Sequence, residues 1–89
     1  GAVAIDKAVV LRAISLLRVL DHQPDIFPTA RNTIQFEYEY GDDYLEIEIF
    51  DGYFNVYRCV DNGETEYRTT AFQRVREEVL NYHASIRNK

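Results

Sequence analysis

Apolar and polar residues alternate along much of the segment from Thr33 to Thr70, a period of two that is typical of strands with one buried and one exposed face. Three turn signals interrupt the alternation, at residues 41–43, 51–52 and 62–63. The last two, Asp-Gly and Asn-Gly, are strong signals for two-residue hairpin turns. The segment is therefore predicted to form four short strands in an antiparallel meander.

Matching the faces of neighbouring strands predicts how they pair. A shift by one residue would place apolar side chains opposite polar ones throughout, so the register is well specified. Asp42-Asp43 is expected at the first turn tip, Asp51-Gly52 at the second and Asn62-Gly63 at the third. The predicted pairs are Tyr40 with Leu45, Tyr38 with Ile47, Phe36 with Ile49, Ile49 with Phe54, Ile47 with Val56, Val60 with Thr65, and Arg58 with Tyr67.

Helices are predicted on both sides of the meander. Residues 3–20 lack Gly and Pro, and their apolar residues fill an arc of about 180°, wider than the stripe of about 100° that a surface helix needs. Two interpretations remain open: the helix packs deeply on the sheet, or apolar residues in its polar strip also contact a second subunit. Those residues are Ala8, Leu11 and Val19. The last helix is predicted to begin with a capping box over residues 70–73.

Residues 21–32 are predicted to be an irregular connection, because Pro24 and Pro28 stop helix continuation. Ile26 and Phe27 are expected to anchor this connection against the sheet edge or a helix end, and His22 is expected to be solvated. The predicted fold is one α+β domain over residues 1–89, in the order α-β-β-β-β-α. Both helices lie on one face of a four-stranded antiparallel meander.

One run resembles a known pattern: P-x-I-x-P-T-x-x-x-x-I-x-F-E-Y. It is carried by Pro24, Ile26, Pro28, Thr29, Ile34, Phe36, Glu37 and Tyr38. The run is similar to one in small uncharacterised bacterial α+β proteins, in which a helix leads through a proline-rich elbow into strands. The resemblance implies a bacterial, cytoplasmic protein, and it implies no catalytic residues.

Charge and cysteine content indicate which classes of partner and which cellular location to expect. The chain has 89 residues and a net charge of −5, which disfavours nucleic-acid backbone and anionic membrane as partners. No apolar run approaches the roughly 20 residues that cross a bilayer. Cys59 is the only cysteine, so an internal disulfide is impossible and a reducing, cytoplasmic location is expected.

The sheet face turned away from the helices is predicted to be acidic and aromatic. In the predicted register Glu37 falls opposite Glu48, and Glu39 opposite Glu46, although like charges across strands are destabilising. Tyr53, Tyr57 and Arg68 complete this candidate site. Three interpretations remain open: a solvated face, a docking surface for a basic partner, and a metal site. The last fits least well, because glutamates on flat strands rarely converge.

The sequence offers little for catalysis. An open sheet face is expected to provide no concave, partly dry pocket for acid-base chemistry. Cys59 is predicted near Tyr44 and Glu66, whose charge disfavours a thiolate, and neither histidine is expected beside it. The chain has no phosphate-binding glycine loop and no His/Cys metal spacing. No catalytic residue, cofactor or metal is therefore predicted.

The function predicted is a non-enzymatic module that binds another protein or itself. A homodimer is expected to form through the first helix, at Ala8, Leu11 and Val19, with pairing along the last strand as the other route. The alternative is a small-molecule-binding domain with a cleft between the helices and the tyrosine-rich sheet face. An apolar pocket lined by Tyr38, Tyr40 and Tyr67 would favour this alternative. A fully packed core without such a pocket would favour the interaction module.

Overall fold

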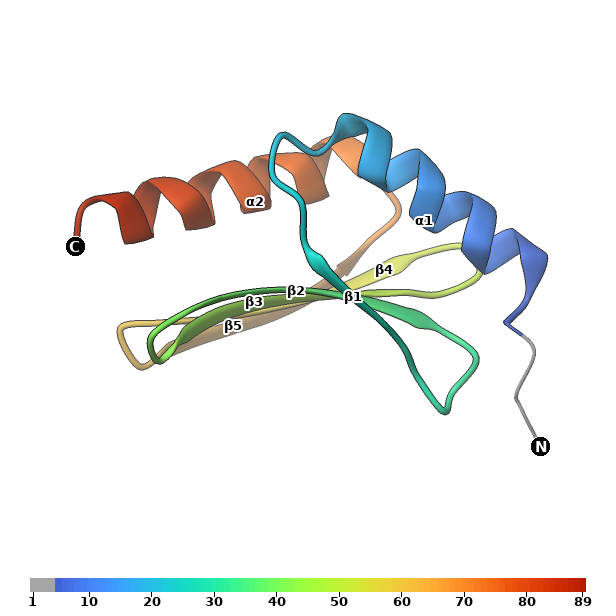
Figure 1. Cartoon of the computed structure of the whole chain (residues 1–89), viewed down its shortest axis with the longest axis horizontal. Coiled ribbons are helices and arrows are strands. Elements are labelled where there is room, and N and C mark those ends of the chain that lie inside the picture. The colour runs from blue at the N-terminus through green and yellow to red at the C-terminus, as the bar shows by residue number, and fades with distance from the viewer. Residues whose placement is uncertain (1–4) are drawn as a thin grey trace.

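The computed structural model describes residues 5–89 and contains two helices and one open antiparallel sheet. The elements are α1 (Lys7–Val19), β1 (Asp25–Pro28), β2 (Ile34–Tyr40), β3 (Asp43–Ile49), β4 (Phe54–Val60), β5 (Gly63–Thr69) and α2 (Phe72–Arg87). The strands lie in chain order across the sheet, and both helices cover the same face (Figure 1). The predicted α+β meander with helices on one face is confirmed, but the predicted number of strands is wrong: residues 5–89 form five strands.

The additional strand is β1, within the predicted irregular connection. Ile26 pairs with Phe36, and Thr29 N–H donates to the Thr33 carbonyl at 3.0 Å to close the β1–β2 hairpin. Proline is tolerated in an edge strand, because its missing N–H can face away from the ladder. Ile26 and Phe27 are 48% and 46% exposed, so backbone pairing rather than burial holds them at the sheet edge.

Two of the three predicted registers are displaced by two residues. Tyr38 pairs with Leu45 rather than Ile47, and Val56 rather than Arg58 pairs with Tyr67. The β3–β4 register is confirmed, with Ile49 opposite Phe54 and Ile47 opposite Val56. A shift by two residues leaves every side chain on its predicted face, so the assignment of residues to the two faces survives.

The turns explain these displacements. Gly41 and Asp42 occupy the centre of the first turn, where Gly41 has a φ of 59°. Asp61 and Asn62 form the third turn with φ values of 53° and 66°, as a type I′ turn requires. The sequence favoured Asn62-Gly63 because glycine adopts positive φ most readily, but here the Asp-Asn pair adopts it.

Both predicted helix starts are also displaced. The part of the predicted first helix at residues 3–4 lies outside the described residues, and α1 begins after Asp6, whose carboxylate accepts a hydrogen bond from Ala8 N–H at 3.0 Å. The capping box predicted at residues 70–73 is absent: Ala71 is the N-cap of α2 and makes no side-chain cap. Thr69 Oγ1 instead accepts from Ala71 N–H at 3.1 Å.

The core lies between the two helices and one face of the sheet. In β3 every second residue is buried, and Leu45, Ile47 and Ile49 are fully so. The helices contribute chiefly Val9, Ala13, Leu16, Val75, Val79 and Tyr82. Tyr40, at the end of β2, was expected under the helices but is 53% exposed. No helix within residues 5–89 is long and apolar enough to cross a membrane.

Candidate functional site

The face of the sheet opposite the helices, here called the open face, carries side chains in rows that cross the strands. One row consists of Asp25, Glu37, Glu46, Tyr57 and Glu66, each directly opposite the next. We call it the acidic row. It differs from the predicted arrangement, because Glu37 faces Glu46 rather than Glu48, and Glu39 faces Tyr44. In the observed register, four carboxylates lie in this one row across the sheet.

The open face carries the net charge of the whole chain. Its carboxylates are Asp25, Glu37, Glu39, Glu46, Glu48, Glu64 and Glu66, against the two arginines Arg31 and Arg68. The difference equals the net charge of −5, so acidic and basic residues balance over the remaining surface. A strongly one-signed face on an otherwise balanced domain concentrates cations and basic groups near it.

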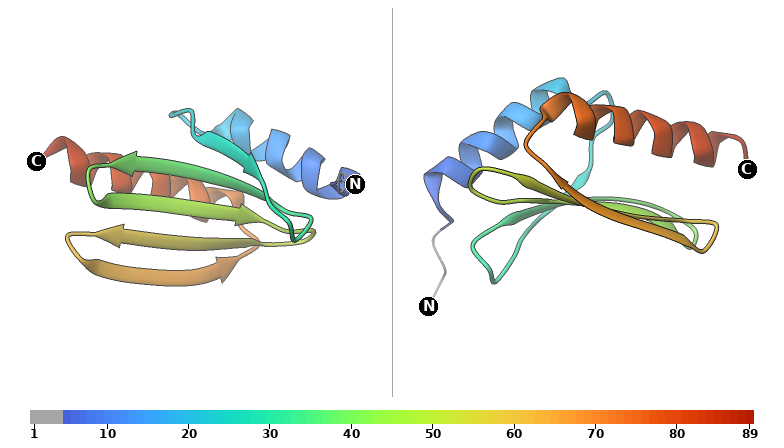
Figure 2. Two further views of the ribbon diagram at one scale, coloured as in Figure 1. Left: turned by 60° about the horizontal axis from the view of Figure 1, so that its bottom comes forward. Right: turned by 180° about the vertical axis from the view of Figure 1, so that it is seen from behind.

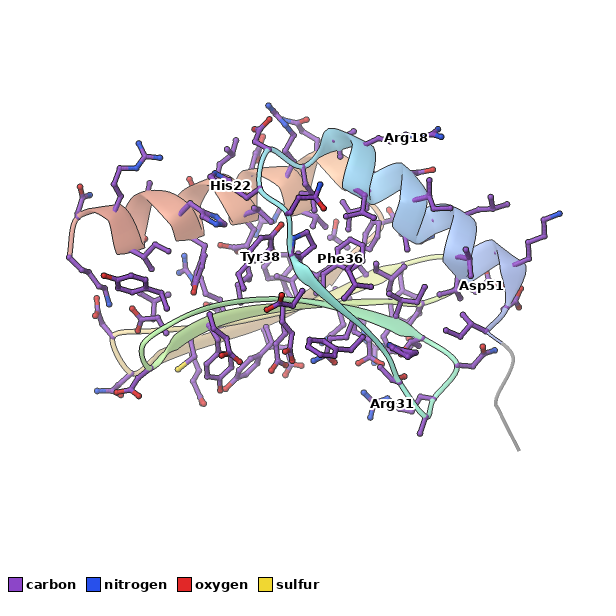
Figure 3. The ribbon with its side chains drawn as sticks, in the orientation of Figure 1. Arg18, His22, Arg31, Phe36, Tyr38 and Asp51 are labelled. Atoms are coloured by element: carbon purple, nitrogen blue, oxygen red, sulfur yellow. The ribbon has the colours of Figure 1, made fainter. Side chains whose placement is uncertain are left out.

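Arg31 neutralises one corner of this face. It lies at the tip of the β1–β2 hairpin, which bends below the sheet on the side away from the helices (Figures 1 and 3). Its Nε and Nη2 atoms donate to the two oxygens of Glu48 at 3.1 and 2.9 Å, and Thr33 Oγ1 donates to the same carboxylate at 2.6 Å. The sequence did not predict this pair, because the hairpin that brings Arg31 under the sheet was itself missed.

Glu46, at the centre of the acidic row, lies in a different environment. Burial raises the pKa of its carboxyl group above the ordinary value, and the negative charges of Glu37, Glu39, Glu48 and Glu66 raise it further. Desolvation and like charges both disfavour an ionised carboxylate. Ionisation of Glu46 therefore reduces the stability of the folded state, and a nearby cation would relieve that effect.

We expect Glu46→Gln to stabilise the protein at pH 7 by a few tenths to about 1 kcal/mol, the range of a cross-strand like-charge pair. Because the folded protein raises the pKa, the destabilisation is present above the folded-state pKa and disappears as pH falls below the value of the unfolded chain. Urea denaturation of both proteins at pH 7 and near pH 3 measures the difference. A glutamine variant less stable than the parent at pH 7 would contradict this account of Glu46.

Aromatic side chains border the carboxylates. The Phe50 and Tyr53 rings stack with centroids 4.6 Å apart, and the Arg68 guanidinium lies 5.1 Å from the centre of the Tyr53 ring. Tyr57 stacks on Tyr44 at 5.6 Å and donates a hydrogen bond to Glu64, which raises the pKa of the Tyr57 hydroxyl. Rings beside carboxylates offer a basic side chain both a π face and a counter-charge.

The open face is hollowed, contrary to the expectation that it offers no concavity. A shallow polar hollow of about 250 Å³ is lined by Arg31, Gln35, Glu46, Glu48, Asn55, Tyr57 and Glu66. Arg31 lines it from the tip of the β1–β2 hairpin, which the predicted four-stranded sheet lacked. Asn55 Nδ2 donates to Glu66 at 2.9 Å, whereas none of the hydrogen bonds within residues 5–89 involves the carboxylate of Glu46.

The remaining candidate residues do not join this site. Cys59 is half-buried at the end of the open face, between Tyr44 and Glu64 rather than beside Glu66. The histidines lie on the helix side, where His22 stacks on His83 with centroids 3.6 Å apart. His22 was expected to be solvated and is partly exposed, but nothing in the sequence pattern signalled its stack on His83. Within residues 5–89 no group of three or more His, Cys, Asp or Glu side chains could hold a metal ion.

The three residues predicted for a dimer interface lie on the outer side of α1. Leu11 and Val19 are 53% and 39% exposed, and Ala8 is exposed with them. Ile14 adds a further exposed apolar side chain to the same helix. This surface and the acidic row are on opposite sides of the molecule, because α1 covers the other face of the sheet (Figure 1).

Comparison with known proteins finds no family model, no curated protein and no solved structure that matches this chain.

Proposed function

We propose that this protein is a non-enzymatic interaction module whose open face binds a basic segment of a partner protein. The observation that carries the proposal is the acidic row with Glu46 at its centre. The row gathers carboxylates across the sheet, and only part of the negative charge on the open face is matched by arginines of the same chain. A lysine- or arginine-rich segment complements this surface in charge.

Two local features favour an arginine-rich partner segment. Arg31 already makes two parallel N–H···O bonds to Glu48, which shows the geometry that a guanidinium adopts at this edge of the hollow. Glu46 and Glu66 lie on the other side of the hollow, beside the Tyr57 ring. A second guanidinium placed there would contact two carboxylates and a ring, and would offset the repulsion that raises the pKa of Glu46.

The small-molecule alternative has less support. Tyr38 is buried, and its hydroxyl donates to the His22 carbonyl at 2.7 Å. Tyr67 lies on β5, three strands along the sheet from Tyr38 on β2, and its hydroxyl donates to Glu78 at 3.0 Å. Tyr40 is exposed beyond the end of the core. The three tyrosines that would line such a cleft therefore point to different neighbours, and two of their hydroxyl groups already have partners.

Fluorescence anisotropy with a labelled, arginine-rich peptide tests the proposed function. We expect the triple variant Glu37→Gln, Glu46→Gln, Glu66→Gln to bind about tenfold more weakly than the parent, if each charge contributes about 0.5 kcal/mol. Affinity for the parent should fall as salt is raised, because exposed charges are screened. An acidic peptide of the same length should not bind.

A matched control separates the site from net charge alone. The variant Asp42→Asn, Asp51→Asn, Glu77→Gln removes three negative charges from turns and from α2, away from the acidic row. We expect it to retain most of the affinity of the parent. Equal losses in both variants would reduce the effect to non-specific attraction, and no loss in the open-face variant would rule out this face as the binding surface.

A further inference from the structure

We propose that the free edge of β5 pairs with β5 of a second copy of this chain, forming a homodimer with one continuous ten-stranded sheet. β5 is the outermost strand, and among residues 5–89 no other element lies beside its free edge (Figure 2, left). α2 packs mainly over β3 and β4, and its Arg74 and Glu78 side chains contact β5 on the helix side of the sheet, at Tyr67. An uncovered edge presents unpaired N–H and C=O groups that can pair with another strand.

The two edges of the sheet differ in how well they are protected. β1 has four residues, ends in Pro28 and follows Pro24, and both features discourage further pairing. β5 has seven residues, and its sequence, Gly-Glu-Thr-Glu-Tyr-Arg-Thr, contains neither proline nor lysine. The partner is therefore expected at β5 rather than at β1.

The outward hydrogen-bonding groups of β5 can be assigned from its turn. In a type I′ turn the Val60 carbonyl accepts from Gly63 N–H, which makes these two residues a hydrogen-bonded pair. Such pairs alternate along an antiparallel ladder, so Thr65, Tyr67 and Thr69 direct their backbone groups toward β4. Glu64, Glu66 and Arg68 consequently direct theirs outward, where a partner strand would pair with them.

Only certain registers of the β5–β5 pair are compatible with a two-fold axis and also place the opposing side chains of the two copies on the same face of the sheet. With the axis at Tyr67, Glu66 of each copy lies opposite Arg68 of the other, which gives two hydrogen-bonded pairs of opposite charge on the open face. With the axis at Glu66 or at Arg68, that residue faces itself and the like charges repel. The strand is therefore self-complementary in the register centred on Tyr67.

The outer side of α1 is the competing route to a dimer, and its charges fit less well. Leu11 and Ile14 are its exposed apolar centre, with Lys7 and Arg18 exposed on the same side of the helix. Two antiparallel copies of α1 that placed Leu11 on Ile14 would bring Lys7 of one copy near Arg18 of the other. Like charges at both ends oppose this arrangement, and nothing else identifies what would cover the patch.

Edge pairing would also enlarge the proposed binding surface, because it joins two open faces into one. It does not depend on the proposed function, since the pairing uses the strand edge: it engages Glu66 of the acidic row but leaves Glu37 and Glu46 free. A single strand pair buries less area than the roughly 1,200 Å² of a standard stable interface. We therefore expect a weak dimer, populated at micromolar to near-millimolar protein concentration.

Sedimentation equilibrium of the whole chain and a charge-swap cycle test the proposal. Glu66→Arg and Arg68→Glu each place like charges across the axis, and each should weaken dimerisation about tenfold. The double variant Glu66→Arg, Arg68→Glu recreates two opposite-charge pairs in the register centred on Tyr67, and should restore dimerisation. An axis at Glu66 predicts no such restoration, because the arginine introduced at position 66 would then face the same arginine of the other copy. Thermal unfolding of each variant checks that the monomer remains folded.

Two further variants distinguish a dimer interface at the edge of β5 from one on α1. Glu66→Pro removes an N–H that points away from β4, so it should abolish dimerisation while the β4–β5 ladder is retained. Leu11→Glu alters the competing surface on α1 and should leave dimerisation unchanged. A chain that is monomeric at all concentrations overturns the proposal. So does a dimer that resists Glu66→Pro or is dissociated by Leu11→Glu, since either result places the interface elsewhere.

Discussion

Replacing Tyr82 with alanine is expected to lower the free energy of unfolding by about 3–5 kcal/mol, the usual loss when a large buried aromatic side chain is removed. Tyr82 lies on α2 and is completely buried. It is the largest of the fully buried side chains, and its ring lies 6.3 Å from that of Tyr38 on β2. The alanine variant would leave a cavity between α2 and the sheet that the surrounding side chains fill only in part.

The Tyr82→Phe variant separates the contribution of the ring to stability from that of the hydroxyl group. The Tyr82 hydroxyl lies 3.2 Å from the Asp43 carbonyl and 3.4 Å from the Tyr38 carbonyl, both longer than a usual O–H···O bond of about 2.5–3.0 Å. We therefore expect Tyr82→Phe to cost only about 1 kcal/mol, at the low end for a lost buried hydrogen bond. Urea denaturation monitored by circular dichroism measures both losses. A loss for phenylalanine as large as that for alanine would mean that the hydroxyl, not packing, holds α2.

Truncation of Leu16 to alanine is expected to cost about 2–5 kcal/mol, whereas the same change at Leu11 should cost less than about 0.5 kcal/mol. Both leucines lie on α1, but Leu16 is completely buried and Leu11 is 53% exposed. Helix propensity changes equally in the two variants, so the difference between them reports burial alone. The comparison therefore measures how much the docking of α1 contributes to stability.

Chemical denaturation of both variants, repeated at several protein concentrations, measures these losses. Similar losses at Leu11 and Leu16 would show that the exposed side of α1 is covered in solution, or that α1 is rotated relative to the structure. Dilution distinguishes the two, because a cover provided by a second copy is lost as protein concentration falls.

Alternation in the sequence predicted the two sheet faces correctly, because a period of two depends only on local side-chain direction. It did not reveal β1, whose four residues are too few to show a period and are bounded by prolines that resemble an irregular segment. The strand exists because residues 25–28 pair with β2, a contact that no local pattern encodes. A short strand that is stabilised mainly by pairing with its neighbour therefore cannot be recognised from its own sequence.

The predicted registers were wrong where the sequence contains two overlapping turn signals. At the third turn the sequence contains both Asp61-Asn62 and Asn62-Gly63, and the second is the stronger signal by residue preference. The structure uses the first, in which Lys89 at the end of the chain donates to Asp61 and to Asp43. Asp61 N–H also donates to Asp43 at 3.0 Å. These contacts with the first turn involve residues distant in sequence, which turn preferences do not consider.

The sequence predicted only part of the candidate site, because Asp25 and Glu66 of the acidic row were not among the predicted residues, and it did not predict the geometry. Glu37 and Glu46 were placed on the correct face, yet their direct opposition required the correct register. Arg31 and the hollow beside Glu46 depend on the bend of the β1–β2 hairpin, and so could not be predicted from a four-stranded sheet. The face was therefore predictable from alternation, and its shape and partial neutralisation were not.

Amide chemical-shift mapping of the ¹⁵N-labelled chain during titration with the arginine-rich peptide locates the binding surface residue by residue. Binding to the acidic row predicts progressive shifts on the open face, in β2 to β5 around Glu37, Glu46, Tyr57 and Glu66, with little change along the outer side of α1. The shifts should diminish in the variant with glutamine at positions 37, 46 and 66. Shifts concentrated on α1 and α2, or none at peptide concentrations that saturate the anisotropy signal, would contradict the assignment of binding to the acidic row.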